Sequence, residues 1–155
     1  MAEITTCIIG VDPGLKGAIA FFFPEHGRLC AEDMPVANGD VDAATLAARI
    51  QQLGPTVAIV EGVHAMPKQG TASTFKFGKG YGTVLGVLAA LGVPTHIVAP
   101  TAWKRHFKLN SDKDASRALA LRFWPARSDL FGRKKDDGRA EAALIARFYA
   151  EKVMK

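Results

Sequence analysis

Two carboxylates stand directly after short apolar runs, where a buried strand would end. Asp12 follows the run Cys7–Val11 and precedes Pro and Gly, and Glu61 follows the run Val57–Val60 and precedes Gly. Short apolar runs that are rich in Ile and Val and stopped by turn residues indicate buried strands. Because an unpaired charge is costly inside a sheet, we expect Asp12 and Glu61 at a sheet edge, facing something positive.

A second group of acids lies near the C-terminus. Asp136 and Asp137 open a predicted helix, and Glu141 follows within an otherwise apolar stretch. Asp137 and Glu141 are four residues apart, so both can point to one side of that helix. Asp136 is turned by about 140° from Glu141 at about 100° per residue, which makes it the reserve candidate. Acids at a helix N-terminus also serve as caps, and this is the alternative for Asp136 and Asp137.

Carboxylates gathered in one place repel one another unless a cation neutralises them. The predicted catalytic residues and metal ligands are Asp12, Glu61, Asp137 and Glu141, with Asp136 as a further ligand candidate. Oxygen ligands without a His or Cys cluster favour Mg²⁺, with Mn²⁺ as a substitute. Two such ions can activate a water and stabilise the leaving oxygen in phosphodiester hydrolysis. No organic cofactor is expected.

Charge is unevenly distributed along the chain. Between Gly62 and Lys135 there are thirteen Lys and Arg residues against three carboxylates, in a chain of net charge +5. A segregated basic region suits a polyanion such as DNA, with a solvated basic surface as the alternative. The candidate DNA contacts are Lys68, Gln69, Lys76, Lys79, Lys104, Lys108, Lys113, Lys134 and Lys135. Trp103 and Trp124 are assigned to the core rather than to base stacking.

The elements that must position these residues follow an α/β pattern. Strands are predicted over residues 5–11, 17–23 and 28–34, joined by short turns, and over 57–60 and 93–98. Helices are predicted over about 42–53, 74–91, 100–105, 111–124 and 136–153, with loops over 35–40, 65–74 and 126–135. We expect one domain over residues 1–155, with a mixed five-stranded sheet that helices flank and whose first three strands are antiparallel.

Three acidic motifs occur in order along nearly the whole chain, at 10–14, 60–62 and 134–142. With the glycine- and lysine-bearing helix after the second acid, they resemble the RuvC family of Holliday junction resolvases. The resemblance implies a ribonuclease H-like fold, a homodimer that cuts four-way DNA junctions symmetrically, and two Mg²⁺ ions per active site. The third motif departs from the bacterial enzymes, which have two aspartates three residues apart, because position 138 is Gly. The short chain is more similar to phage-type members.

The loop after Glu61 lies where the resemblance places the centre of the junction. An inserted side chain can separate base pairs there, and apolar wedges do unstack DNA. Met66 is the large apolar residue of this loop, and Phe75 lies just beyond it. The alternative for Met66 is packing beneath the loop. His64 is a candidate for assisting proton transfer because of its position near Glu61.

Together these features predict a Mg²⁺-dependent endodeoxyribonuclease that resolves four-way junctions in DNA recombination and repair. Neither a membrane span nor a signal peptide is apparent, so we expect the cytoplasm of a bacterium or of a phage-infected host. A ribonuclease and a broader branched-DNA nuclease are alternatives of the same fold, and a non-catalytic junction-binding module is an alternative of another class. An actin-like ATPase also opens with Asp-x-Gly-x-x-Gly, but it needs two lobes and a longer chain.

Overall fold

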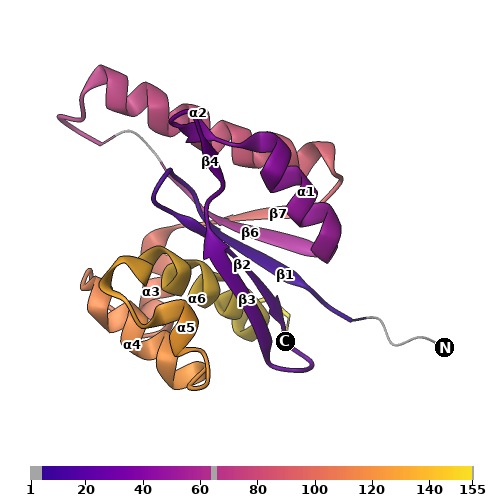
Figure 1. Cartoon of the computed structure of the whole chain (residues 1–155). Coiled ribbons are helices and arrows are strands. Elements are labelled where there is room, and N and C mark those ends of the chain that lie inside the picture. Colours follow the sequence, from indigo (N-terminus) through magenta and orange to yellow (C-terminus); the bar gives the residue numbers. More distant parts are fainter. Residues whose placement is uncertain (1–4, 64–65, 155) are drawn as a thin grey trace.

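A five-stranded sheet separates two layers of helices in the computed structural model of the chain, which describes residues 5–63 and 66–154 (Figure 1). Its strands are β1 (Ile8–Asp12), β2 (Ala18–Phe23), β3 (Arg28–Asp33), β6 (Val57–Glu61) and β7 (Thr95–Val98). Their order is β3-β2-β1-β6-β7; β2 is antiparallel to β1 and β3, and β6 is parallel to β1 and β7. The predicted mixed sheet with three antiparallel first strands is therefore confirmed.

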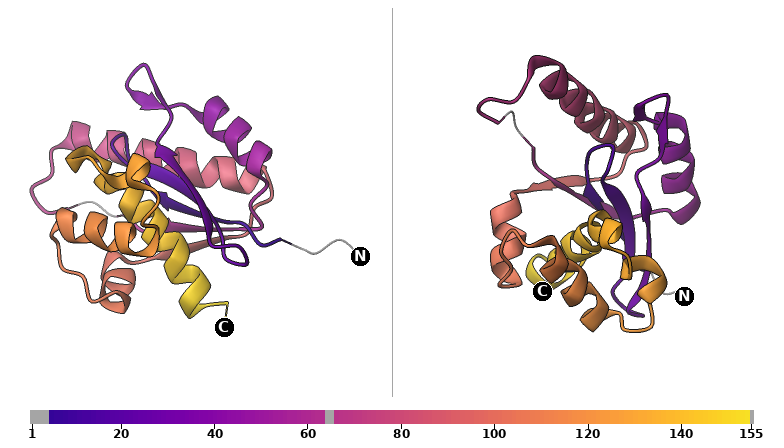
Figure 2. Two further views of the ribbon diagram at one scale, coloured as in Figure 1. Left: turned by 60° about the horizontal axis from the view of Figure 1, so that its bottom comes forward. Right: turned by 60° about the vertical axis from the view of Figure 1, so that its left-hand side comes forward.

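Helices cover both faces of this sheet (Figure 2). One face carries α1 (Ala43–Leu53) and α2 (Thr71–Ala90), and the other carries α3 (Pro100–His106), α4 (Lys113–Phe123), α5 (Ser128–Phe131) and α6 (Asp137–Lys152). Alternate strand residues point to opposite faces, so each face has its own apolar core. Ile9 packs with the α1 and α2 side, whereas Ile8 packs with the α6 side. Over the described residues, none of the helices is long and apolar enough to cross a membrane.

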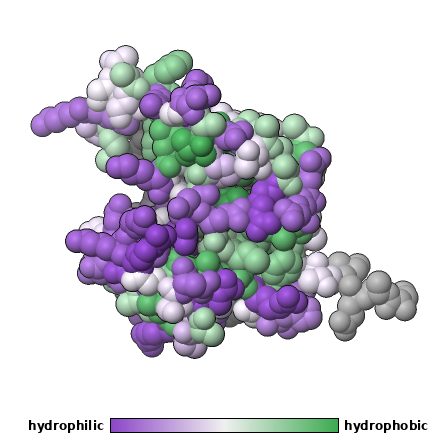
Figure 3. Space-filling model, in the orientation of Figure 1, coloured by the Kyte–Doolittle hydropathy of each residue, from purple (hydrophilic) through white to green (hydrophobic). Residues whose placement is uncertain are grey.

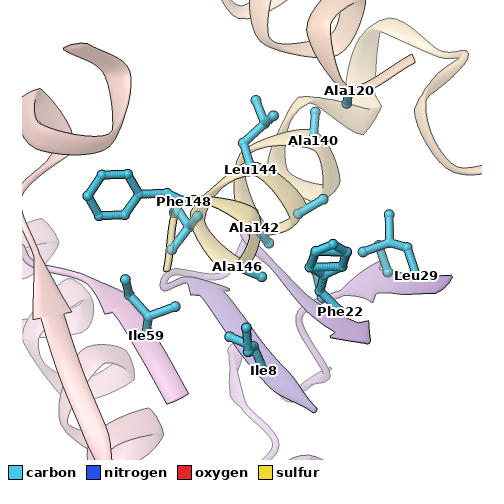
Figure 4. Packing of buried hydrophobic residues seen from close by; sticks show 14 of the residues in the cluster. Ile8, Phe22, Leu29, Ile59, Ala120, Ala140, Ala142, Leu144, Ala146 and Phe148 are labelled. Carbon is cyan, nitrogen blue, oxygen red and sulfur yellow. The ribbon is translucent and has the colours of Figure 1, made fainter. Parts of the chain in front are cut away.

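Helix α6 is buried along most of its length. Its buried residues include Ala142, Leu144, Ile145 and Ala146, so apolar side chains point in several directions around the helix axis. The sheet strands β1 and β2 contact one side of it, and α4 packs against another. Figure 4 shows alanines of α6 facing β1 and β2. A helix that is apolar on most sides belongs inside the molecule rather than at its surface.

Helix α2 is supported over only part of its length. Its buried residues are Gly80, Val84 and Leu88, while Thr71–Lys79 contains none. These first turns, which we call the α2 overhang, extend past the end of the sheet in Figure 1. The core therefore holds the second half of α2 and leaves the first half projecting.

Side-chain caps begin two helices where the sequence predicts them. The Asp42 carboxylate accepts a hydrogen bond from the Thr45 amide at 3.2 Å, and α1 then ends at Gly54, whose φ of 59° is left-handed. The Asp112 carboxylate accepts from the Asp114 amide at 2.9 Å and starts α4.

The structure adds short elements where loops are predicted. Strands β4 (Val36–Ala37) and β5 (Asp40–Val41) form a two-stranded ribbon, and α2 begins at Thr71 instead of about residue 74. The predicted basic loop 126–135 contains α5 and most of the 3₁₀ helix η1 (Lys134–Asp136). The apolar pair Leu130 and Phe131 is buried and fixes α5 to the core, which the high charge of this segment conceals in the sequence.

Candidate active site

Asp12 and Glu61 are the last residues of two neighbouring strands. β1 and β6 run parallel, and their register places Val11 beside Val60. The next residues, Asp12 and Glu61, therefore come side by side at the same edge of the sheet. Because Val11 and Val60 point into the core beneath α1 and α2, strand alternation turns both acids toward the face that α6 covers.

Glycine at position 10 lets α6 lie directly on β1. A Cβ there would lie 2.7 Å from the amide nitrogen of Ala146, and closer still to the carbonyl oxygen of Ala142. Both distances are shorter than van der Waals contact, so no side chain fits between strand and helix. This close approach brings Glu141, the residue before Ala142, to the end of β1 that bears Asp12.

Gly138 is equally constrained at the start of α6. A Cβ at this position would lie 2.9 Å from the carbonyl oxygen of Lys16, in the turn that follows Asp12. The main chain of that turn occupies the space that a side chain at position 138 would need. The departure of this position from the bacterial aspartate pattern thus has a physical reason.

Three carboxylates meet at this point. Asp12, Glu61 and Glu141 each offer an oxygen, and these oxygens lie within 4.8 Å of one another. Burial, followed by the charges of Glu141 and Glu61, raises the pKa of Asp12 well above its ordinary range. Burial is also the main cause that raises the pKa of Glu61. The like charges therefore destabilise one another until a cation joins them.

The donor set fits a hard divalent cation. Every gathered ligand atom is a carboxylate oxygen, the type that Mg²⁺ and Mn²⁺ prefer. Within residues 5–63 and 66–154, no other three His, Cys, Asp or Glu side chains gather in this way.

Asp137 lies close to this cluster, but a lysine contacts it. The Lys113 Nζ is 3.2 Å from Asp137 Oδ2, and the bond to this carboxylate raises the pKa of Lys113. The charge of Asp137 still contributes to the raised pKa of Asp12, which shows that the two are near each other. A cation that enters the cluster would compete with Lys113 for Asp137.

Asp136 lies outside the carboxylate group and has other partners. Its side chain is 1% exposed, and Arg133 donates to it from the backbone amide at 2.8 Å and from Nη2 at 2.9 Å. Burial opposes ionisation, but the hydrogen bonds from Arg133 outweigh it and lower the pKa of Asp136. The Asp136 amide in turn donates to the Arg133 carbonyl oxygen at 2.9 Å, so Asp136 anchors the turn η1 that leads into α6.

A cavity of about 890 Å³ opens beside the carboxylates. Its lining combines Asp12, Asp137 and Glu141 with four lysines, namely Lys16, Lys76, Lys113 and Lys135. Figure 3 shows the surface hollowed between the α2 overhang and the opposite helical layer, with hydrophilic residues on both sides. Acidic oxygens and lysine ammonium groups thus share one cavity.

Other predicted DNA contacts lie outside this cavity. Lys104 and Lys108 line a second hollow on α3 together with Arg105. Lys79 forms an exposed ion pair with Asp40 at 3.0 Å. Lys134 is exposed on η1.

The loop between β6 and α2 presents both polar and apolar groups. Lys68 is exposed, whereas Gln69 braces the loop by accepting from the Met66 amide at 3.1 Å and donating to Ser73 at 3.3 Å. Met66 is 59% exposed and Phe75 is 73% exposed. Neither side chain is buried beneath the loop, which removes the alternative of packing for Met66.

Sequence reasoning missed three residues of this region. Lys16 and Phe77 line the cavity, and Lys16 could have been found from its place in the turn after Asp12. Trp103 is buried, as predicted, but its indole Nε1 also donates to Glu61 Oε2 at 2.7 Å. That contact joins residues far apart in the chain and leaves no local signal. His64, the candidate for proton transfer, lies outside the described residues.

Solved structures with the same fold include Holliday junction resolvases. Thermus thermophilus RuvC in complex with a Holliday junction substrate is 15% identical, with a TM-score of 0.66 over 96% of both chains. The chain has the RuvC fold. The fowlpox virus Holliday junction resolvase is 17% identical with a TM-score of 0.59 over 96% of this chain and 99% of that chain. The predicted ribonuclease H-like architecture is therefore confirmed.

A relative in sequence carries the same name. The chloroplastic Holliday junction resolvase MOC1 of Chlamydomonas reinhardtii is 30% identical over an alignment 149 residues long, and the match covers 77% of this chain. The chain matches only 17% of that protein's length. No protein-family model matches the chain. The RuvC fold thus rests on structure over the whole sheet and its helices, with support from one distant sequence relative.

Proposed function

We propose that this chain is a metal-dependent endonuclease that cuts four-way DNA junctions. The observation that carries this proposal is the cluster of Asp12, Glu61 and Glu141, whose oxygens lie within 4.8 Å beside a lysine-lined cavity on the RuvC fold. A protein that only bound a polyanion would gain nothing from buried negative charge at its binding surface. The relatives named above, which are Holliday junction resolvases, support a branched DNA substrate.

The cluster would hold Mg²⁺, for which Mn²⁺ can substitute. Asp12, Glu61 and Glu141 would supply the shared ligands, and Asp137, once it leaves Lys113, would extend the site toward a second ion. When bound, two such ions supply Lewis-acid stabilisation to the attacking and leaving oxygens of the phosphodiester. The ligand oxygens stay close together because β1 carries Asp12, β6 carries Glu61 and α6 carries Glu141, and these elements pack against one another.

The lysines of the cavity would hold the DNA backbone. Lys16, Lys76, Lys113 and Lys135 reach the cavity from the turn after β1, from α2, from α4 and from η1, so they surround the carboxylates. Each ammonium group that neutralises a phosphate adds affinity that falls with salt. The exposed side chains of Met66, just before α2, and of Phe75, in its first turns, are the candidates for separating base pairs at the junction centre.

We also propose a homodimer as the working form, because two symmetric cuts in one junction require two active sites.

Both cysteines, Cys7 and Cys30, carry free thiols. The two free thiols suit a reducing compartment, and we propose the cytoplasm of a bacterium or of a phage-infected cell.

A comparison of substrates tests the proposed activity. Labelled four-way junction, replication fork, linear duplex and RNA–DNA hybrid are each incubated with the protein, in Mg²⁺ and in EDTA. We expect paired, symmetric nicks in the junction alone, and only with Mg²⁺. Asp12→Asn should bind the junction without cutting it, whereas Asp129→Asn, which removes an exposed acid outside the cavity, should cut normally.

The other outcomes identify the alternatives. Cutting of forks as well as junctions would indicate a broader branched-DNA nuclease. Cutting of the hybrid alone would indicate a ribonuclease. Tight binding of the junction without cutting in Mg²⁺ or Mn²⁺ would leave a binding module, and cutting by a clean preparation of Asp12→Asn would remove the carboxylate cluster from the mechanism.

A further inference from the structure

A buried tryptophan contacts the carboxylate cluster. Trp103, in the first turn of α3, has no exposed surface, and its Nε1 lies 2.7 Å from Glu61 Oε2. Neither Trp103 nor Glu61 is among the residues that line the cavity. The indole therefore reaches Glu61 within the protein interior and does not itself occupy the cavity.

The hydrogen bond from Trp103 has the features expected of a contact that orients the Glu61 carboxylate. Within the described ranges, Trp103 is the one side chain that donates a hydrogen bond to Glu61. The bond is short, as expected when the acceptor is charged. The indole ring is packed in the apolar core beside α6, so its N–H has a fixed direction. A buried indole N–H in turn needs an acceptor, and Glu61 supplies it.

The neighbouring residue adds charge to the same support. Lys104 Nζ lies 5.5 Å from the centre of the Trp103 ring, in the range of a cation–π interaction. Among the three clustered carboxylates of the described chain, Glu61 alone has such a fixed hydrogen-bond donor behind it.

We propose that Trp103 is a positioning residue that holds the Glu61 carboxylate in the orientation needed to bind the metal. This inference rests on the proposed metal-dependent function. The indole donates to Oε2, and over the described residues Oε1 accepts no hydrogen bond from a side chain. Outer partners that orient a ligand in this way typically change metal affinity by about 10- to 100-fold when they are removed.

The two tryptophans of the chain provide a test that leaves the contact intact. In Trp124→Phe, the remaining indole N–H resonance in a ¹H–¹⁵N spectrum belongs to Trp103. We expect it to lie downfield, because its acceptor is a carboxylate, and to move during a Mg²⁺ titration. The Trp124 resonance, observed in Trp103→Phe, should stay in place. Glu61→Gln in the Trp124→Phe protein should move the Trp103 resonance upfield and remove its response to Mg²⁺.

Metal affinity is the second measurement. Trp103→Phe keeps an aromatic ring and removes the donor, and Trp124→Phe is its matched control, because Trp124 is buried in the same core. Binding of Mn²⁺ is measured by calorimetry without DNA, after the spectra show that both variants are folded. We expect affinity to fall by about 10- to 100-fold in Trp103→Phe and to stay within about threefold of the wild type in Trp124→Phe.

The possible results distinguish failure of the Trp103 role from failure of the metal-dependent function on which it rests. If Trp103→Phe binds Mn²⁺ as tightly as Trp124→Phe, or if the Trp103 resonance ignores Mg²⁺ that the protein binds, Trp103 is only a core residue. The proposed nuclease would then stand unchanged. If the wild-type protein binds neither ion, the inference and the metal-dependent function fail together.

Discussion

Replacing Gly10 by Ala would put a methyl group where α6 lies against β1. The new Cβ would lie 2.9 Å from the Cβ of Ala146, against roughly 3.5–4 Å for an ordinary carbon contact. The helix must therefore retreat by roughly 1 Å, and it carries Glu141 away from Asp12 and Glu61.

Both stability and activity follow from this shift. Overpacking of this kind costs about 1–3 kcal/mol. At about 2 kcal/mol, the Tm of a chain of this size falls by about 4–8 °C. A misplacement of about 1 Å at a catalytic centre can cost about 100-fold in rate. Junction binding should change little, because the lysines of the cavity lie mostly on other elements.

Thermal melting and single-turnover cleavage below the Tm check these figures. Gly86→Ala is the control, since Gly86 lies inside α2 with open space around it and Ala favours a helix by about 1 kcal/mol. We expect this control to melt at or above the wild-type temperature. A Gly10→Ala protein that melts and cuts like the wild type would refute the idea that contact between Gly10 and α6 sets the spacing of the carboxylates.

Three further predictions concern the charged residues around the site. Because the pKa of Asp12 is raised in the folded chain, ionisation of this carboxyl opposes folding. The metal-free wild type should therefore lose stability relative to Asp12→Asn as pH rises through that folded-state pKa. Melting in EDTA over a pH series checks this, and the same dependence of Tm on pH in both proteins would contradict it. Lys76→Gln should weaken junction binding and reduce the slope of log affinity against log salt by about one, whereas Lys152→Gln, outside the cavity, should leave the slope unchanged in fluorescence anisotropy. Asp136→Asn should lower the free energy of unfolding by about 1–3 kcal/mol, because it weakens the hydrogen bonds that Arg133 donates to the buried Asp136 carboxylate, yet keep Mg²⁺-dependent cleavage at low temperature. Asp137→Asn should keep the wild-type stability and lose Mg²⁺-dependent cleavage. Loss of cleavage in Asp136→Asn would instead make Asp136 the ligand.

The sequence predicts the strand-end acids well because their signal is local. Asp12 and Glu61 each follow an apolar run, and parallel pairing of those runs then brings the acids together. Glu141 is recognisable as the charge within an apolar helix. The antiparallel order of β1, β2 and β3 follows from the short turns that join them.

Contacts between distant segments could not be predicted in the same way. Trp103 reaches Glu61 across 42 positions, and Lys79 pairs with Asp40, on a ribbon that the sequence does not signal. Asp136 and Asp137 are adjacent in the chain, and only the position of Arg133 and Lys113 shows that their partners differ. Partners of this kind depend on packing, which a local pattern does not contain.

The two walls of the cavity differ in how firmly the core holds them. Helix α6 is enclosed by the sheet and by α4, so its amide hydrogens should exchange with solvent only when the whole molecule unfolds. The α2 overhang has no buried residue and should exchange through local opening at a small free-energy cost. The proposed DNA substrate can therefore be accommodated by movement of the α2 overhang, while Asp12 and Glu61 on the sheet and Glu141 on α6 keep their spacing.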